Sequence, residues 1–356
     1  MKKVGIFVEY NPFHTGHLYH LEQSKKYGDI IVAIMSPHVV QRGEIALFNK
    51  FKRARNAIDN GVDIVCELPS IFTLQSAQNF SQGMVECANL AKVDYVVFGA
   101  ENPNTDLLFE IANSNVGEAW IKSRLAAGNS YNKILRDNYQ LFANDILAIS
   151  YIRALKKYPH IKPIIIQREN NYHDLDSIGN FVSASAIRQH RTEEIYQKYS
   201  LINLENSYYP EIIFPYLKYK ILCSSKQELA NIFLVEEGIE SLFKKEILIN
   251  SDYNSFIQNC TSKRYSTSRI RRTLLMILFD ITKKEVNNLS PLKKINLLAF
   301  NHKARAYLKE NNQHIASKIN QYQKDYFEIE LKINQLLSYI CQNDDFNNLQ
   351  GRYNLY

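Results

Sequence analysis

Two features are scarce in this sequence: cysteine pairs and long apolar runs. Its five cysteines include no Cys-x-x-Cys pair, a pattern that fits neither a disulfide framework nor a structural zinc site and indicates a reducing, cytoplasmic environment. The apolar run Val4–Val8 ends at Glu9, too early for a signal-peptide core or a membrane span. The sequence therefore gives no indication of export, of membrane association or of a protein partner.

Glycine and proline are also few, at 12 and 9 residues, which excludes a collagen-like chain, while a hydrophobic content of 46% excludes a wholly disordered one. The length of 356 residues predicts about two domains. The formal net charge is +7, and most of the positive excess falls after residue 200. A mild excess of this kind raises the expectation of a polyanionic partner only modestly.

The first half of the chain alternates short apolar runs with longer amphipathic ones, the pattern of a parallel sheet covered by helices. The expected strands are nearly continuous in apolar character, as strands buried on both faces are; they are Val4–Val8, Ile30–Met35, Val62–Leu68, Tyr95–Phe98 and Ile161–Ile166. The expected helices have apolar residues three and four apart; they are His17–Tyr27, Lys50–Asp59, Ser76–Ala91 and Asp145–Lys157, the last with Asn144 as its N-cap. The pattern predicts an α/β fold.

The strand pattern fades after about residue 200, where runs of helical period replace it. We place a domain boundary near Leu201–Pro215. The sequence thus predicts an α/β unit over residues 1–200 and a mostly helical, basic unit over residues 201–356.

The segment Asn11-Pro12-Phe13-His14-Thr15-Gly16-His17 lies between the first expected strand and the first expected helix. Ligands of open α/β sheets bind at the carboxyl ends of the strands, where the N-terminus of the next helix attracts phosphate. Gly16 permits close backbone approach, and His14 and His17 can donate hydrogen bonds to phosphoryl oxygens during a displacement at phosphorus. The segment predicts a phosphate site in which the two imidazoles stabilise charge.

A zinc site is an alternative for these histidines, because His14, His17 and His20 are spaced three residues apart. A span of six residues carries the third histidine well round the helix, and no nearby cysteine completes a ligand set. A simple polar helix surface is a further alternative. The position between a strand and a helix favours the phosphate site.

A second segment, Ser183-Ala184-Ser185-Ala186-Ile187-Arg188, follows the last expected strand. Small hydroxyl residues at a helix start leave room for an anion, and Arg188 one turn later can reach a phosphate. An ordinary serine N-cap with a solvated arginine is the alternative. Paired with the histidine segment, the phosphate reading is favoured, because both helix starts would face one crevice.

A basic block lies in the second half and contains no acidic residue; its positive members are Lys263, Arg264, Arg269, Arg271 and Arg272. With Thr267 or Ser268 as N-cap, the last three arginines fall near the first turn of a helix, where cations are unfavourable unless an anion lies opposite. A solvated charge run is the alternative. We favour contact with an RNA backbone.

Several blocks of the chain resemble, in order, the tRNA-Met cytidine acetate ligase family within the HxGH nucleotidylyltransferase superfamily. The resemblance covers nearly the whole chain, and the first block is highly specific. The blocks are Val8 to His20, Gln41-Arg42-Gly43-Glu44, Glu67-Leu68-Pro69, Phe98-Gly99-Ala100-Glu101, Asn144-Asp145, Arg168 with Tyr172-His173-Asp174, Ser183 to Arg188, and Tyr265 to Arg272.

The resemblance implies a Rossmann-like catalytic unit over residues 1–200 and a tRNA-binding unit over residues 201–356. It implies that acetate and ATP, with Mg²⁺ on the triphosphate, form acetyl-adenylate, and that the acetyl group passes to the wobble cytidine of elongator tRNA-Met. The catalytic residues would be His14, His17, Ser183, Ser185 and Arg188. ATP would contact Phe7, Val8, Glu9, Tyr10, Asn11, Pro12, Phe13, His14, Thr15, Gly16, His17, Leu18, Tyr19, His20, Gly99, Asn144 and Arg168.

The chain departs from the family pattern around residues 36–45, where Pro37 replaces a usual glycine and Ile45 a usual proline. Proline fixes φ and has no N–H, so the loop has a different allowed backbone. An alternative function is transfer of AMP to a small phosphorylated metabolite, as in cofactor-synthesising nucleotidylyltransferases. The basic second half and the resemblance beyond the histidine block favour the ligase.

Overall fold

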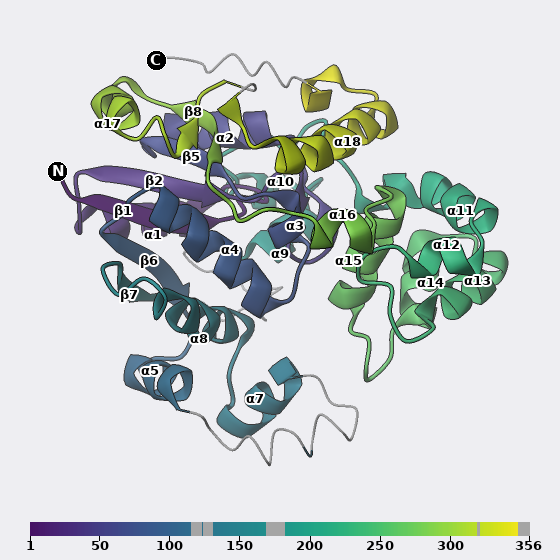
Figure 1. The fold of residues 1–356 in the computed structure, drawn as a ribbon. Coiled ribbons are helices and arrows are strands. Elements are labelled where there is room, and N and C mark those ends of the chain that lie inside the picture. Colours follow the sequence, from purple (N-terminus) through teal and green to yellow (C-terminus); the bar gives the residue numbers. More distant parts are fainter. Residues whose placement is uncertain (115–122, 124–130, 169–181, 319–320, 348–356) are drawn as a thin grey trace.

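The computed structural model describes residues 1–114, 123, 131–168, 182–318 and 321–347. A seven-stranded sheet has the order β7-β6-β1-β2-β5-β8-β9 (Figure 1). Its first five strands in chain order are mutually parallel: β1 (Lys3–Val8), β2 (Ile30–Met35), β5 (Ile64–Glu67), β6 (Tyr95–Ala100) and β7 (Lys162–Gln167). The predicted α/β fold with a parallel sheet is confirmed. Both ends of each predicted strand lie within two residues of the ends of an observed strand.

The central strand β2 is buried on both faces because it carries an apolar side chain at each of its six positions. Along β2, Ile30, Val32 and Ile34 belong to one hydrophobic core, whereas the alternating residues belong to a second core on the opposite face. The first core contains residues of α4 (Ala77–Leu90), α5 (Thr105–Asn113), α7 (Tyr131–Tyr139) and α8 (Ala143–Leu155). The second contains residues of α1 (Thr15–Lys25) and α2 (Lys50–Asp59).

Local capping explains where these helices begin. Asn49 accepts a hydrogen bond from the Lys52 N–H at the start of α2, and Ser76 accepts one from the Asn79 N–H at the start of α4. The prediction of Asn144 as an N-cap is wrong, because α8 begins two residues earlier than predicted, at Ala143, with Phe142 as its N-cap. The Asn144 side chain instead donates to Glu101 across the loop that follows β6.

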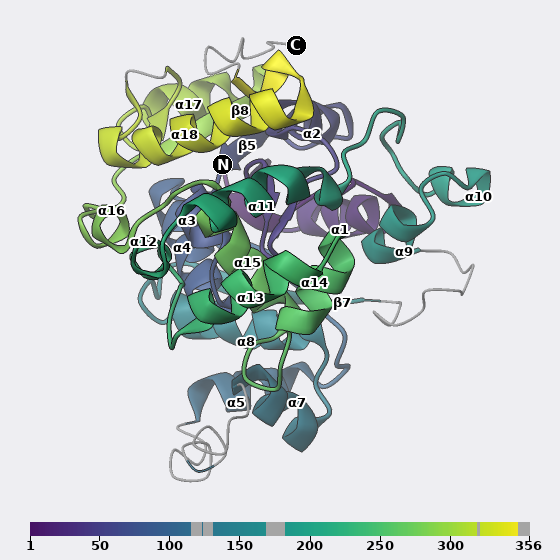
Figure 2. The same cartoon turned by 90° about the vertical axis from the view of Figure 1, so that its right-hand side faces the viewer.

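A group of short helices lies beyond the carboxyl ends of β1 and β2, as Figures 1 and 2 show from two sides. The group packs around Phe243 and Phe256, which are fully buried. Its members are α11 (Phe214–Cys223), α12 (Lys226–Ala230), α13 (Ile239–Ile249), α14 (Tyr253–Cys260), α15 (Thr267–Leu278) and α16 (Lys283–Asn287). We call these elements the helical group.

The chain then returns to the sheet, and here the structure differs from the expectation that strands end near residue 200. Strand β8 (Ile295–Phe300) pairs antiparallel with β5, and β9 (Ile315–Ala316) pairs with β8. Strand β8 is not predictable from its sequence, because a short run with five apolar residues among six cannot be told from a buried helix segment by periodicity alone. The later helices α17 (Arg305–Glu310) and α18 (Lys324–Cys341) also lie against the sheet side of the molecule (Figure 1).

The remaining elements are short connections around the carboxyl edge of the sheet. Strands β3 (Val39–Val40) and β4 (Glu44–Ile45) form a separate antiparallel hairpin. Helices α3 (Ser70–Thr73), α9 (Ala184–Gln189) and α10 (Glu194–Gln197) complete the connections. The block Tyr172-His173-Asp174 lies outside the described residues. Among the helices described, none combines the length and apolar character needed to span a bilayer.

Candidate active site

The histidine segment lies where the strand order of the sheet reverses. From β1 the chain passes to β2 and β5 on one side, and then to β6 and β7 on the other. In open α/β sheets this reversal opens a crevice at the carboxyl ends of the strands, where ligands bind. Because β1 ends at Val8 and α1 begins at Thr15, residues 9–14 line this position, as the sequence predicts.

His14 is the N-cap of α1. Its Nδ1 accepts a hydrogen bond from the Gly16 N–H at 3.0 Å, and its side chain is buried. In the neutral imidazole the proton is therefore on Nε2, which can donate to a ligand. A Cβ on residue 16 would lie 2.8 Å from His14 Cε1, so glycine is needed for the ring to lie across the helix start.

His17 lies close to His14 within an aromatic cage, with the two rings tilted by 45°. The two imidazole centroids are 3.9 Å apart, and His17 lies edge-on to Tyr10 at 5.1 Å. Tyr10 and Phe13 are themselves in contact at 4.4 Å and almost fully buried. Tyr10 and Phe13, which are among the predicted ATP contacts, therefore form the cage that orients His17.

Burial keeps these imidazoles neutral near pH 7. Burial, with smaller contributions from the positive charges of Arg168 and Arg188, lowers the pKa of His14 to about 3. Burial also lowers the pKa of His17 well below its usual range, and burial with the Arg168 charge lowers the pKa of His20 to about 4. The three side chains thus offer N–H donors without carrying a charge of their own.

Four buried polar atoms in this segment have no hydrogen-bond partner in the structure. They are Tyr10 Oη, Thr15 Oγ1, His17 Nδ1 and His20 Nε2. Buried polar atoms of folded proteins almost always have partners, so this cluster fits a ligand with several hydrogen-bonding oxygens, such as a nucleotide phosphate. In the part of the chain that the structure describes, no three His, Cys, Asp or Glu side chains are grouped so as to hold a metal ion.

The second predicted segment is brought against the first. Ser183 is the N-cap of α9 and accepts a hydrogen bond from the Ala186 N–H at 3.1 Å. Arg188 donates to the Asn11 carbonyl oxygen at 2.8 Å and to Ser185 Oγ at 3.0 Å. The structure therefore places both helix starts beside the same loop, as the sequence analysis expects.

The predicted contacts from other strands also reach this crevice. Gly99 lies in β6, next to Arg168 at the end of β7, because a Cβ on residue 99 would lie 3.1 Å from Arg168 Cγ. Asn144 donates to the Glu101 carboxylate from both its backbone N–H and its side chain. Burial raises the pKa of Glu101, and these hydrogen bonds and Arg168 oppose that shift.

Other residues of the first block make contacts that hold the loop in place. The Asn11 side chain accepts from the Leu47 N–H, and the Glu9 carboxylate accepts from the Gln41 N–H at 2.7 Å. Phe7 packs on Tyr151 with ring centroids 4.8 Å apart. Val8 is buried in the core, the Asn11–Pro12 peptide bond is cis, and Leu18 and Tyr19 are half-buried on α1.

Arg53 is a further residue of the site that sequence reasoning missed. It is buried, and its guanidinium donates to four main-chain carbonyl oxygens, those of Glu9, Ser36, Pro37 and Phe48. It thereby joins the loops that follow β1 and β2. Its position supplies a signal in the sequence, because Arg53 continues the apolar face that Ala54 and Ala57 mark on α2.

The basic block is paired within the chain. The N-cap of α15 is Ser266, one residue before Thr267 and two before Ser268, the two predicted N-caps. Carboxylates of the same chain pair with three of the five positive residues, and the predicted contact of the block with RNA stays a prediction. The pairs are Arg264 with Glu237, Arg269 with Glu236, and Arg271 with Glu44, while Arg272 donates to the Gln41 carbonyl oxygen. Lys263 is exposed.

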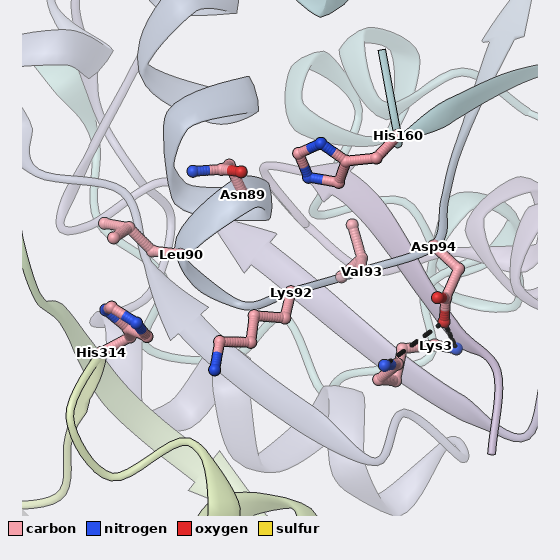
Figure 3. A pocket seen from close by; sticks show the side chains of 8 residues that line it. All are labelled: Lys3, Asn89, Leu90, Lys92, Val93, Asp94, His160 and His314. Atoms are coloured by element: carbon pink, nitrogen blue, oxygen red, sulfur yellow. Dashed lines mark hydrogen bonds and ion pairs between the residues drawn. The ribbon is translucent and has the colours of Figure 1, made fainter. Parts of the chain in front are cut away.

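A surface pocket lies at the amino ends of the strands, on the side of the sheet opposite to the histidine segment. Three of its lining residues, Lys3, Asp94 and His160, come at or just before the starts of β1, β6 and β7. Lys3 and Asp94 form an ion pair, and the histidines 160 and 314 point from separate sides (Figure 3). This pocket is separate from the histidine segment.

Comparison with known proteins agrees with this geometry. The family model described as HIGH Nucleotidyl Transferase matches residues 1–352. The tRNA(Met) cytidine acetate ligases of Staphylococcus aureus strains MRSA252 and JH9 are each 35% identical over 376 aligned positions, which cover 98% of both chains.

Two solved structures are similar over the whole fold. Thermotoga maritima TmcAL bound with alpha-thio ATP has a TM-score of 0.86 at 25% identity, covering 100% of this chain and 99% of that chain. The apo form of the same protein has a TM-score of 0.84 at 27% identity, covering 99% and 96%. This chain therefore belongs to the tRNA(Met) cytidine acetate ligase family of the HIGH nucleotidyl transferases.

Proposed function

We propose that this chain is an ATP-dependent ligase that activates acetate as acetyl-adenylate and transfers the acetyl group to the wobble cytidine of elongator tRNA-Met, forming 4-acetylcytidine. The observation that carries the proposal is the cluster of buried, unpartnered polar atoms around His17 at the strand-order reversal. The names of the relatives and the ATP analogue bound to the Thermotoga maritima protein support it. A tRNA substrate implies action in the cytoplasm.

In the first step an acetate oxygen attacks the α-phosphorus of ATP and pyrophosphate leaves. Nothing in this displacement needs a covalent protein intermediate, so the side chains position the substrates and stabilise charge. His14 Nε2 and the His17 ring donate to phosphoryl oxygens, and Arg188 and Arg168 supply positive charge beside them. In the second step the exocyclic amine of cytidine attacks the acetyl carbonyl and AMP leaves.

Mg²⁺ is proposed to accompany the triphosphate. Protein sites for this ion commonly use one or two carboxylates together with substrate phosphates and water. Since the described residues contain no cluster of three metal-binding side chains, the phosphate oxygens and water would supply most of its ligands.

Exchange of pyrophosphate into ATP tests the first step directly. Purified protein with Mg²⁺ and without RNA is expected to exchange labelled pyrophosphate into ATP only when acetate is present. Labelled acetate should then enter tRNA-Met at the wobble cytidine. Exchange that requires a phosphorylated metabolite instead of acetate would favour the alternative, transfer of AMP to such a metabolite.

The helical group is proposed to bind the tRNA backbone, with Lys263 and Arg264 as contacts because both side chains are exposed. We expect the double variant Lys263→Ala/Arg264→Ala to bind tRNA more weakly, and by a similar factor for tRNAs of different sequence. The slope of log affinity against log salt should fall by about 1 for each contact removed. The exposed Lys309→Ala variant on α17 is the control; an unchanged slope in the double variant would place the RNA contacts elsewhere.

A further inference from the structure

The β3–β4 hairpin connects the helical group to the proposed ATP site. Its tip is formed by Gln41, Arg42 and Gly43, between Val40 and Glu44. On the sheet side, the Gln41 N–H donates to Glu9 Oε1 at 2.7 Å, and Glu9 directly follows β1. The tip is thereby attached to the loop that carries His14.

The opposite side of the tip rests on the first turns of α15. Arg271 pairs with the Glu44 carboxylate, and Arg272 donates to the Gln41 carbonyl oxygen at 3.0 Å. Gly43 has a φ of +81°, and a Cβ there would lie 2.5 Å from the Arg272 backbone nitrogen. The contact thus includes main chain as well as side chains, and leaves no room for a larger residue.

The hairpin also gathers a set of charges beside the Ser183 segment. Arg42, Arg188 and Arg271 interact electrostatically with one another and with Glu9 and Glu44. Burial is the main cause that lowers the pKa of Arg42, and the positive charges of Arg188 and Arg271 lower it further. The Glu9 and Glu44 carboxylates oppose this shift. Three guanidinium groups against two carboxylates leave an excess positive charge next to Arg188, which donates to the histidine loop at Asn11.

We propose that Arg271 and Arg272 are positioning residues of the adenylate-forming site: α15 holds the β3–β4 hairpin so that Gln41 fixes Glu9 and Arg42 stays beside Arg188. The inference rests on the proposed function. It gives these two arginines a positioning role in place of the predicted contact with RNA. It makes the helical group a part of the ATP site, even in the absence of tRNA.

The variant Arg271→Ala tests this role when acetate-dependent ATP–pyrophosphate exchange is measured without RNA. We expect kcat for exchange to fall about 10- to 100-fold, because small misplacements of groups around a reacting centre have effects of that size. Affinity for ATP, measured by calorimetry on the same proteins, should weaken about threefold. Arg55→Ala is the matched control, since Arg55 forms an exposed ion pair with Asp59 on α2.

A double-mutant cycle with Glu44→Gln separates positioning from a general loss of structure. If Arg271 acts through Glu44, the double variant should lose no more exchange activity than the more damaged single variant. Either of two measurements shows that a variant keeps its fold. The first is a urea midpoint equal to that of the wild type within experimental error, and the second is wild-type affinity for tRNA. Arg271→Ala with wild-type exchange and wild-type ATP affinity would overturn the inference, as would fully additive losses in the cycle.

The same measurements distinguish failure of the inference from failure of the proposed function. Wild-type protein that shows no acetate-dependent exchange contradicts the proposed acetate chemistry. In that case the ATP affinities of wild-type and Arg271→Ala protein still decide the positioning role, because they do not depend on acetate. Equal affinities overturn it, and a weaker affinity in the variant supports it.

Discussion

Replacement of His14 or His17 by alanine is expected to lower kcat for acetate-dependent pyrophosphate exchange by roughly two to three powers of ten, the effect of removing one donor to a developing oxyanion. The reason is geometric. His14 is buried at the start of α1 with Nδ1 already bonded to the Gly16 N–H, so its Nε2 proton is the one left to donate to a ligand. Steady-state exchange at saturating ATP and acetate measures the loss.

His160→Ala is the control for these variants, because His160 is exposed at the opposite edge of the sheet. The low pKa of His14, about 3, adds a second expectation. In free protein the C2 proton of His14 should keep the chemical shift of a neutral imidazole down to pH 5, measured by NMR. Near-normal turnover in both alanine variants would exclude the proposed role of the two imidazoles.

Replacement of Lys50 by methionine is expected to lower the free energy of unfolding by about 3–5 kcal/mol, because it leaves a buried carboxylate without its counter-charge. Lys50 Nζ lies 2.6 Å from Glu67 Oε1, with 2% and 0% of the two side chains exposed. Glu67 also accepts a hydrogen bond from Asn296 of β8 at 2.7 Å. Urea unfolding at pH 8 measures the loss.

The pH dependence of this loss has a definite sign. Glu330 lies near the pair, and burial followed by the Glu67 charge raises its pKa to about 7, which the Lys50 charge opposes. Without Lys50 this opposing charge is absent, so the Glu330 carboxyl favours the protonated form still more strongly in the folded protein. A group whose folded-state pKa is raised stabilises the fold below its unfolded pKa and loses that contribution as the pH rises, so the deficit of Lys50→Met should be smaller at pH 5 than at pH 8.

Two comparisons decide the interpretation. Lys324→Met removes an exposed lysine paired with Glu328, and surface pairs of this kind contribute little. The double variant Lys50→Met/Glu67→Gln should recover part of the lost stability, because the unpaired charge is gone. A Lys50→Met protein that unfolds at the wild-type urea concentration would contradict the prediction.

The parallel strands and their helices could be predicted because their signals are local. The sequence predicts β2 at Ile30–Met35 and α2 at Lys50–Asp59, and both are the observed bounds. A buried strand and an amphipathic helix each follow from a short apolar pattern. The histidine loop was likewise predictable, because Gly16 between two histidines marks a helix start after a strand. Each of these signals lies within about a dozen residues.

The contacts between distant segments could not be predicted in this way. Nothing near Arg271 shows that Glu44, more than two hundred residues earlier, balances its charge, and the same holds for the pairing of Asn296 with Glu67. Lys50 was different, because a lysine on the apolar face of α2 is itself a signal of a buried partner. One sequence shows that such a partner is needed but does not show which residue it is.

The antiparallel pairing of β5 with β8 has a consequence for how the chain is made. During synthesis, β5 emerges more than two hundred residues before its partner strand, so its edge stays open while the helical group is still being added. An open edge is a template for pairing with other chains. A nascent chain is therefore expected to be prone to aggregation until Ile295–Phe300 pairs with β5, and a fragment cut at residue 200 is expected to stay so because it lacks this strand.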